Sequence, residues 1–386
     1  MKAFEIDWWP KRVVCEEDAV KRLPELMDSI GRKHAVILCG RSILQSSVYS
    51  QISEILGPRL VGTFNEIEMH APLPVLERGA SYVSSVGGDV LVSIGGGSAI
   101  DSGKGISLIH TVGADYPSYA LNASAPERRA FPELDLAHIA IPTTTGSGSE
   151  VAPTCGLRDP AAGHKRIFRD DRLIPSIAIL DPKVTVGTPA KLTAASGMTA
   201  VARCIESLYS GRRNPMRSAL ALHGLRMLAR SLPRSIVAPE DLDARSECLV
   251  ASALSAIAAN VNTSAVHAVG HVVGGKFGLQ HGVAHAILLA PSMQLMLPII
   301  GEEQKLVLSA LGGSPDGLSA DEAGIRAAEA MAKLVEKLPL PHRLSEVGVE
   351  EAHIAELVDH ASHDPILMSS GGVTREKIAS LFRTVL

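Results

Sequence analysis

The segment DVLVSIGGGSAID, residues 89–101, combines a short apolar run, three consecutive glycines and the start of a helix. A continuous apolar run of this length is typical of a strand buried in a parallel sheet. Glycines let a ligand phosphate approach the backbone, and the free N–H groups of the following helix stabilise its negative charge. We expect Ser98 to be the N-cap of that helix. The segment therefore predicts a strand, a phosphate-binding turn and a helix.

Helices and strands are predicted to alternate on both sides of this segment. Helical periodicity is expected at 17–30, 43–56 and 74–86, and strands at 34–39, 59–64, 89–94, 137–142 and 176–182. Residues 112–135 are expected to be irregular. Strands that alternate with helices predict a doubly wound parallel sheet with helices on both faces.

A second polar turn, IPTTTGSGSEVAPT at 141–154, also follows a predicted strand. Its Thr143, Thr144 and Ser147 offer hydroxyl groups around two glycines. Such a turn can simply satisfy its own backbone. Because both turns follow strands of one sheet, they predict a dinucleotide site at its carboxyl edge.

From residue 188 onward the sequence shows almost only helical periodicity. Helices are expected at 190–210, 214–231, 241–258, 262–273, 283–299, 302–311, 320–337, 350–361 and 374–385. We therefore predict an α/β domain over 1–183 and an all-helical domain over 184–386, with the ligand between them.

The stretch NTSAVHAVGHVVGGKFGLQHGVAH at 262–285 places His267 and His271 one helical turn apart. The glycines of this stretch are Gly274, Gly275 and Gly278. They are expected to end the helix and return His281 toward the same side. Histidines on an Ala/Val-rich helix can also be hydrogen-bonded core residues. Three within 15 residues favour a site that binds a metal or transfers protons.

Composition excludes several classes of partner. The chain has 386 residues, a net charge of -4 and 46% hydrophobic residues, and no basic stripe or signal peptide stands out. These features argue against nucleic acid or membrane partners. Five scattered cysteines without CxxC spacing indicate reduced thiols. We expect a cytoplasmic enzyme that acts on a small molecule.

Four segments carry a family resemblance: GGGSAID, PTTTGSGSE, LDPKVTVGTPAKLTAASGM at 180–198, and the histidine stretch. Together they resemble the iron-containing (group III) alcohol dehydrogenase superfamily. The resemblance implies a modified Rossmann-type domain and a helical domain, as in dehydroquinate synthase-like folds, together with NAD(P)-linked hydride transfer and a homodimer.

The resemblance also implies which residues bind the nucleotide. The pyrophosphate would contact Gly96, Gly97, Ser98 and Asp101, while Thr143, Thr144, Ser147 and Lys165 would contact the rest of the nucleotide, with Lys165 near the nicotinamide ribose. His70 could lie near the nucleotide. The first strand continues into Cys39, Gly40 and Arg41, where no carboxylate excludes a 2′-phosphate, so NADPH use comparable to NADH is expected.

The metal site that the resemblance implies is altered. Relatives use an aspartate and a histidine where this chain has Thr199 and Arg203, whereas His267 and His281 match the other two ligands. A guanidinium has no lone pair to donate, and at about 4 Å it would repel a divalent ion by roughly 8 kcal/mol at an effective dielectric near 20. We predict no catalytic metal in this site.

Roles follow from this replacement. Arg203 is expected to stabilise negative charge on a substrate oxygen or to bind a carboxylate, although it could be a structural arginine. The resemblance implies that His271 is the general acid, with His267 and His281 shaping the pocket or relaying protons. His285 is expected to be structural.

Within the superfamily, MHAPLPVLERG at 69–79, SGMTAVARCIESLYS at 196–210 and HGVAHAILLAP at 281–291 are most similar to the maleylacetate reductase branch of aromatic catabolism. That branch reduces maleylacetate to 3-oxoadipate, so a small acidic carbonyl or enone substrate is expected. Two alternatives stay open: a metal-dependent alcohol or polyol dehydrogenase, and a non-catalytic NAD(P)-binding homologue.

Overall fold

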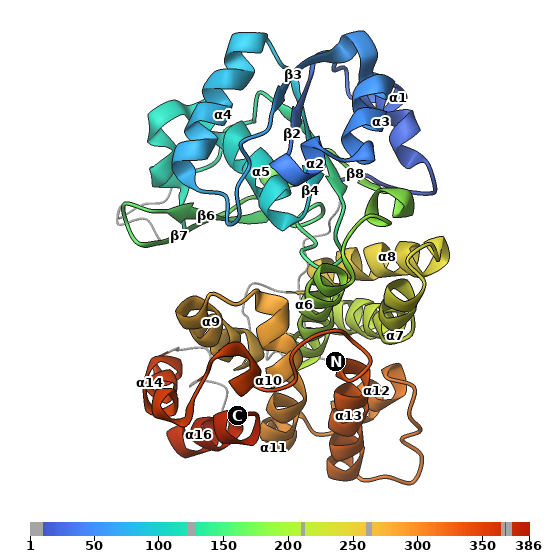
Figure 1. Cartoon of the computed structure of the whole chain (residues 1–386), viewed down its shortest axis with the longest axis vertical. Helices are drawn as coiled ribbons and strands as arrows, with labels where there is room; N and C mark the ends of the chain where they lie inside the picture. The colour runs from blue at the N-terminus through green and yellow to red at the C-terminus, as the bar shows by residue number, and fades with distance from the viewer. Residues whose placement is uncertain (1–10, 122–128, 210–212, 260–264, 364–366, 368–372) are drawn as a thin grey trace. The chain divides into compact units, whose positions relative to one another are not determined.

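The computed structural model describes residues 11–121, 129–209, 213–259, 265–363, 367 and 373–386. Its described residues group into two compact units, which separate between Gly187 and Thr188 (Figure 1). All described strands belong to the first unit, whereas the second is built from helices. The predicted fold class, a parallel α/β sheet followed by a helical domain, is confirmed.

The α/β unit is organised around a six-stranded sheet in which every pair of neighbouring strands is parallel. Across the sheet the order is β1-β8-β5-β4-β2-β3. The strands are β1 (Val13–Cys15), β2 (Ala35–Leu38), β3 (Leu60–Phe64), β4 (Val90–Gly95), β5 (Ala137–Pro142) and β8 (Ile177–Leu180). The five predicted strands correspond to β2, β3, β4, β5 and β8. Strand β1 was not predicted, because its three residues are too few to show an apolar run.

Helices cover both faces of this sheet (Figure 1). Successive side chains of each strand point to opposite faces, so apolar residues on both faces are buried by helices. The helices are α1 (Leu23–Ser29), α2 (Arg41–Leu44), α3 (Ser47–Leu56), α4 (Leu73–Val86) and α5 (Gly97–Val112). On β2, Val36 and Leu38 pack in one core with α4 and α5, whereas Ala35 and Ile37 pack in the other with α1 and α3. Both faces are therefore apolar, which explains the continuous apolar runs in the sequence.

An antiparallel hairpin of β6 (Thr154–Asp159) and β7 (His164–Arg169) was not predicted. Its second strand begins His-Lys-Arg, so it gives no apolar run. Asp159 stabilises the turn, because its carboxylate accepts hydrogen bonds from the N–H groups of Ala161 and Ala162 and pairs with Arg166 at 2.7 Å. A short 3-10 helix, Gly113–Tyr119, occupies part of the stretch expected to be irregular.

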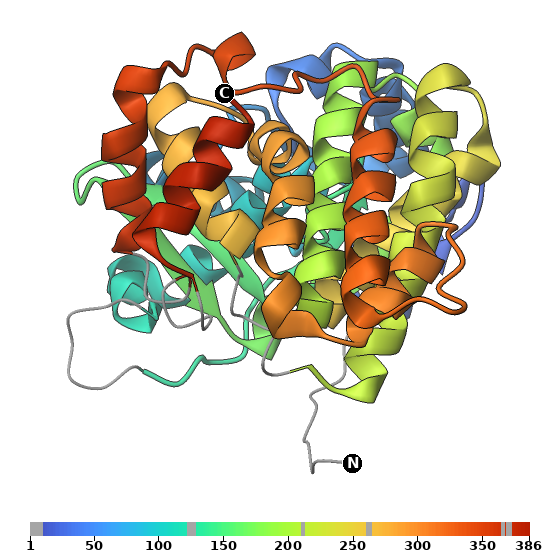
Figure 2. The same cartoon turned by 90° about the horizontal axis from the view of Figure 1, so that it is seen from below.

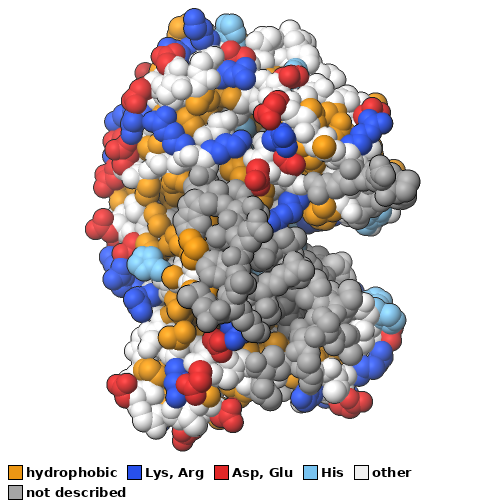
Figure 3. Space-filling view, turned by 180° about the vertical axis from the view of Figure 1, so that it is seen from behind, with side chains coloured by type: hydrophobic (Ala, Val, Ile, Leu, Met, Phe, Trp, Pro, Cys, Tyr) orange, Lys and Arg blue, Asp and Glu red, His pale blue; other side chains and the backbone are white. Residues whose placement is uncertain are grey.

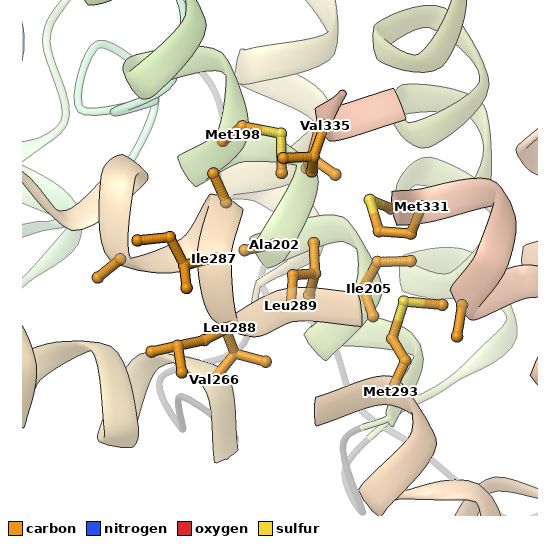
Figure 4. Close-up of a cluster of buried hydrophobic side chains, with 14 of the residues drawn as sticks. Met198, Ala202, Ile205, Val266, Ile287, Leu288, Leu289, Met293, Met331 and Val335 are labelled. Atoms are coloured by element: carbon orange, nitrogen blue, oxygen red, sulfur yellow. The ribbon is translucent and has the colours of Figure 1, made fainter. Parts of the chain in front are cut away.

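The second unit consists of helices close to the predicted ranges. They are α6 (Ala190–Tyr209), α7 (Pro215–Val237), α8 (Leu242–Ala258), α9 (Ala265–Phe277), α10 (His281–Leu295), α11 (Leu297–Ile300), α12 (Glu303–Ala310), α13 (Ala320–Val335), α14 (Glu351–Ser362) and α16 (Arg375–Thr384). Helix α10 packs against α6, α9 and α13 (Figure 2). Figure 4 shows the resulting core, in which Met198 of α6, Leu288 and Met293 of α10, and Met331 of α13 are buried.

The prediction for the end of α9 was partly wrong. Gly274 and Gly275 lie inside the helix, which continues to Phe277. Only Gly278 breaks it, with a φ of 66° that favours glycine. Helix α10 then begins directly at His281.

The surface of the described residues shows mixed charge. Lys, Arg, Asp and Glu side chains intermingle on the face drawn in Figure 3. Within the part of the chain that the structure describes, no helix has both the length and the apolar character needed to cross a bilayer.

Candidate functional site

The strand order places the predicted phosphate turns at one edge of the sheet. The chain passes from β2 outward to β3 and then returns to β4 on the other side of β2, so the order reverses between β2 and β4. In open parallel sheets, ligands bind beyond the carboxyl ends of the strands at such a reversal. Gly40 and Arg41 follow β2 there, and Gly96 and Gly97 follow β4.

The two predicted turns are in direct contact. The N–H of Thr143, after β5, donates to the carbonyl of Gly95 at 3.0 Å. A Cβ at Gly97 would lie 2.7 Å from the Cβ of Ser147, and one at Gly96 would lie 3.1 Å from the Thr144 hydroxyl. Glycine at these positions permits the close approach of the two turns. The first backbone N–H groups of α5 have no intrahelical partners, as at the start of any helix. The turns thus fit a pyrophosphate.

The N-cap prediction was wrong: Gly96, not Ser98, is the N-cap of α5. The hydroxyl of Ser98 instead accepts a hydrogen bond from the N–H of His70 at 3.1 Å. His70 and Ala71 both have positive φ, 65° and 47°. The loop before α4 is therefore held against the predicted phosphate turn in a conformation that non-glycine residues seldom adopt.

Asp101 lies one turn into α5, and its carboxylate is bonded within the protein. It accepts hydrogen bonds from the Ser149 hydroxyl and, at 3.4 Å, from the N–H of Gly156. Lys104, one turn further, is completely buried and donates to Ser149 and to two carbonyls. Burial lowers the pKa of Lys104, and Asp101 partly opposes that shift. Lys104 was not singled out from the sequence, although a lysine among apolar residues was a visible signal.

Lys165 on β7 shares an electrostatic environment with these groups. Although the Lys165 residue is exposed, partial desolvation of its ammonium lowers the pKa of Lys165, while the charge of Asp101 acts in the opposite direction. Burial, Lys165 and Arg158 together lower the pKa of His70. The structure thus brings Asp101, His70 and Lys165, predicted separately from the sequence, within electrostatic range of one another.

In the helical unit, a buried carboxylate holds His267. Glu206 of α6 accepts a hydrogen bond from the backbone N–H of His267 at 3.0 Å and another from the ring Nδ1. Both residues are less than a tenth exposed. Because an ionised carboxylate only accepts hydrogen bonds, Nδ1 of His267 is the donor in this pair. Glu206 was missed by the sequence analysis, since its partner is 61 residues away.

Three imidazoles gather where α9 and α10 meet. The ring centroids of His267 and His285 are 4.2 Å apart, and those of His281 and His285 are 6.4 Å apart. His285 is completely buried. Glycine at position 270 allows the two helices to approach closely, because a Cβ there would lie only 3.2 Å from the His285 ring. The structure therefore brings the predicted His267 and His281 to one region of the unit.

Arg203 and Thr199 lie on α6, one turn apart. Nη1 of Arg203 donates to the hydroxyl of Ser255 on α8 at 3.1 Å, and the Thr199 hydroxyl bonds the carbonyl of Ala195 at 3.4 Å. Glu206 follows Arg203 by one further turn. His271 belongs to α9, but its side chain lies outside the described residues.

The residues at the two altered positions do not fit the metal site that the resemblance implies. A guanidinium offers five N–H donors and no acceptor, so Arg203 cannot replace an imidazole ligand. A threonine hydroxyl that already bonds a backbone carbonyl is a poor substitute for a carboxylate. Only His267 and His281 retain the ligand type.

Comparison with known proteins supports the relationship along nearly the whole chain. Residues 10–182 match the family described as iron-containing alcohol dehydrogenase, and residues 193–386 match its C-terminal part. The chain is 35% identical to a 1,3-propanediol dehydrogenase of Citrobacter freundii over 76% of this chain and 75% of that protein. It is 30% identical to a maleylacetate reductase of Burkholderia cepacia over 95% and 93% of the two chains. A solved structure of 1,3-propanediol oxidoreductase superposes with a TM-score of 0.90 at 28% identity, covering 98% of each chain.

Proposed function

Because the chain belongs to the iron-containing alcohol dehydrogenase family, we propose that it is an NAD(P)-dependent reductase of small acidic carbonyl or enone compounds of the maleylacetate type. The proposal rests on two observations: glycine-rich and hydroxyl-rich turns are in contact at the carboxyl edge of the sheet, and Arg203 stands where the resemblance implies a metal ligand. The relative from Burkholderia cepacia supports the substrate class.

The α/β unit would hold the cofactor. The N–H groups at the start of α5 would bind the pyrophosphate, the Thr143 to Ser147 turn would contact the nucleotide, and Lys165 would contact the nicotinamide ribose. Bound NAD(P)H supplies the hydride. Arg41 follows β2 with an exposed side chain, which supports tolerance of a 2′-phosphate.

The helical unit would bind the substrate. The Arg203 guanidinium would bind a substrate carboxylate or stabilise negative charge on the reacting oxygen. The bond from Nη1 to Ser255 helps to orient the guanidinium. His271 would donate the proton that completes the reduction, and His267 and His281 would line the site.

We propose that this reaction proceeds without a metal in the family's site, on the grounds of the Thr199 and Arg203 side chains themselves. A cation that cannot deprotonate stands at one ligand position. The charge stabilisation that a metal would supply is assigned instead to Arg203.

The test is a substrate panel assayed with NADH and with NADPH, in the presence of chelator or of added iron or zinc. We expect acidic carbonyl and enone substrates, maleylacetate included, to be reduced equally well with chelator. Arg203→Met should lower kcat/KM for them on the order of a hundredfold, because charge-assisted hydrogen bonds contribute about 1.5 to 3 kcal/mol each. Arg226→Met, which changes an exposed arginine on α7, is the matched control. Stoichiometric iron or zinc that is required for turnover would refute the metal-independent mechanism.

A second candidate is oxidation of a small alcohol or diol, which the relative from Citrobacter freundii favours. In that case 1,3-propanediol should be oxidised with NAD, and chelator should abolish turnover. The same panel separates the two functions.

A further inference from the structure

Lys104 is a fully buried lysine with all of its donors used. Its Nζ donates to the Ser149 hydroxyl at 3.1 Å, to the carbonyl of Ala152 at 2.8 Å and to the carbonyl of Thr154 at 3.0 Å. The three acceptors belong to a single segment, residues 149–154, which is the second half of the polar turn at 141–154. One side chain from the middle of α5 therefore fixes this segment at three points.

Ser149 connects Lys104 to Asp101. Its hydroxyl accepts from Lys104 and donates to the Asp101 carboxylate. The other oxygen of Asp101 accepts from the N–H of Gly156 at 3.4 Å, and Oδ1 lies 3.9 Å from the Lys104 ammonium. Helix α5 is thus bonded to residues 149–156, the second half of the polar turn and the start of β6, from two positions one helical turn apart.

The same helix begins at the first phosphate turn. Gly96 is its N-cap, and a Cβ at Gly97 would lie 2.7 Å from Ser147. Any displacement of residues 147–149 relative to α5 would open this contact. The bonds from Lys104 and Asp101 to Ser149 lie immediately beside it and oppose that displacement.

We propose that Lys104, Asp101 and Ser149 form a positioning cluster that holds the two turns at the spacing a pyrophosphate requires. This inference rests on the proposed function, which assigns the turns to the nucleotide. In this role Asp101 acts through its bonds to Ser149 and Gly156 instead of the direct pyrophosphate contact that the resemblance implies, and none of the three side chains needs to touch the ligand. They act through the backbone N–H groups at the start of α5 and through the hydroxyl-bearing turn at 143–147.

The cluster would affect one part of the ligand. Backbone donors bind a pyrophosphate tightly only when they are held in the bound geometry beforehand, because otherwise binding must order them. A nucleoside without phosphates does not use those donors. Loosening the turns should therefore weaken ADP and NADH, whereas adenosine should be unaffected.

Ser149→Ala is the main test, since it removes the hydroxyl that joins Lys104 to Asp101 while leaving the lysine its two carbonyl acceptors. Ser102→Ala is the matched control: this serine is on the same helix, is fully buried, and its hydroxyl has no hydrogen-bond partner among the described residues. The dissociation constants of NADH, ADP and adenosine would be measured for each full-length protein by calorimetry and by cofactor fluorescence.

We expect Ser149→Ala to raise the dissociation constants of ADP and NADH about tenfold and to leave that of adenosine unchanged. Ser102→Ala should change none of them. Lys104→Met should have a larger effect of the same kind, and if it fails to fold, Ser149→Ala still decides. Equal ADP affinity in wild type and Ser149→Ala, or an equal loss for adenosine, would overturn the cluster alone. A wild-type protein that binds neither NADH nor ADP would overturn the proposed function together with it.

Discussion

Acid should destabilise the α/β unit through a single buried imidazole. His138 on β5 is 5% exposed, and its Nε2 lies 2.9 Å from the Ser93 hydroxyl. Its Nδ1 has no hydrogen-bond partner among the described residues. Burial, followed by the charges of Lys104 and Lys11, lowers the pKa of His138 to about 3. In the unfolded chain the pKa of a histidine is about 6.5.

The sign and size of the effect follow from this difference. Between pH 6.5 and 3 the unfolded chain holds a proton that the folded protein does not, so the free energy of unfolding falls as the pH falls through this window. The loss from His138 amounts to about 2 kcal/mol at pH 5 and about 4 kcal/mol at pH 3. A domain is typically stable by about 5 to 15 kcal/mol, so this loss is substantial.

The assay compares wild type with His138→Gln, a side chain that cannot be protonated. Denaturant unfolding would be measured at pH 7 and pH 5, with amide exchange in β4 and β5 reporting on this unit by itself. The variant can differ from wild type in its free energy of unfolding already at pH 7. On going from pH 7 to pH 5, wild type should lose about 2 kcal/mol more of this free energy than the variant. His164→Gln, at an exposed position on β7, is the control and should show no such movement. Parallel loss of stability in wild type and His138→Gln would refute the reasoning.

Four further predictions concern single positions. Gly282→Ala should destabilise the helical unit by at least about 3 kcal/mol in thermal unfolding, because its Cβ would lie 1.5 Å from the Ala195 carbonyl oxygen. Gly275→Ala, inside α9 with open space around its Cβ, should instead raise the free energy of unfolding by about 0.5 to 1 kcal/mol. A lower free energy of unfolding would contradict the open space at this position. Arg217→Met should cost about 3 to 5 kcal/mol in denaturant unfolding, since this buried guanidinium binds the carbonyls at the end of α8. Arg41→Ala should raise the dissociation constant of NADPH about tenfold and leave that of NADH unchanged, and equal changes for both would exclude a 2′-phosphate contact.

Local sequence patterns predicted most of the fold because its strands are buried on both faces. The run before Gly96 is apolar at all but one position, Ser93, so the strand and the turn after it could be predicted without any knowledge of their neighbours. The β6–β7 hairpin was not predicted, because its second strand is largely charged and shows no apolar periodicity. Its turn is stabilised by hydrogen bonds to Asp159.

The candidate site was less accessible to sequence reasoning. Lys104 and Glu206 each act on residues far away in the chain, at separations of 45 and 61 residues for Ser149 and His267. Spacing along one helix cannot reveal such partners. The histidine stretch was identified because its residues are close in sequence, whereas the carboxylate that orients His267 comes from another helix.

The two hydrogen bonds between Glu206 and His267 limit which substitutions this region can accept. One carboxylate accepts hydrogen bonds from both the main chain and the ring of His267, so loss of Glu206 would release the imidazole and the backbone at the start of α9 together. Evolution toward longer or differently shaped substrates would therefore be expected to leave this pair untouched and to proceed by exchanging side chains around it. Directed libraries that aim to broaden the substrate range should accordingly keep both positions constant.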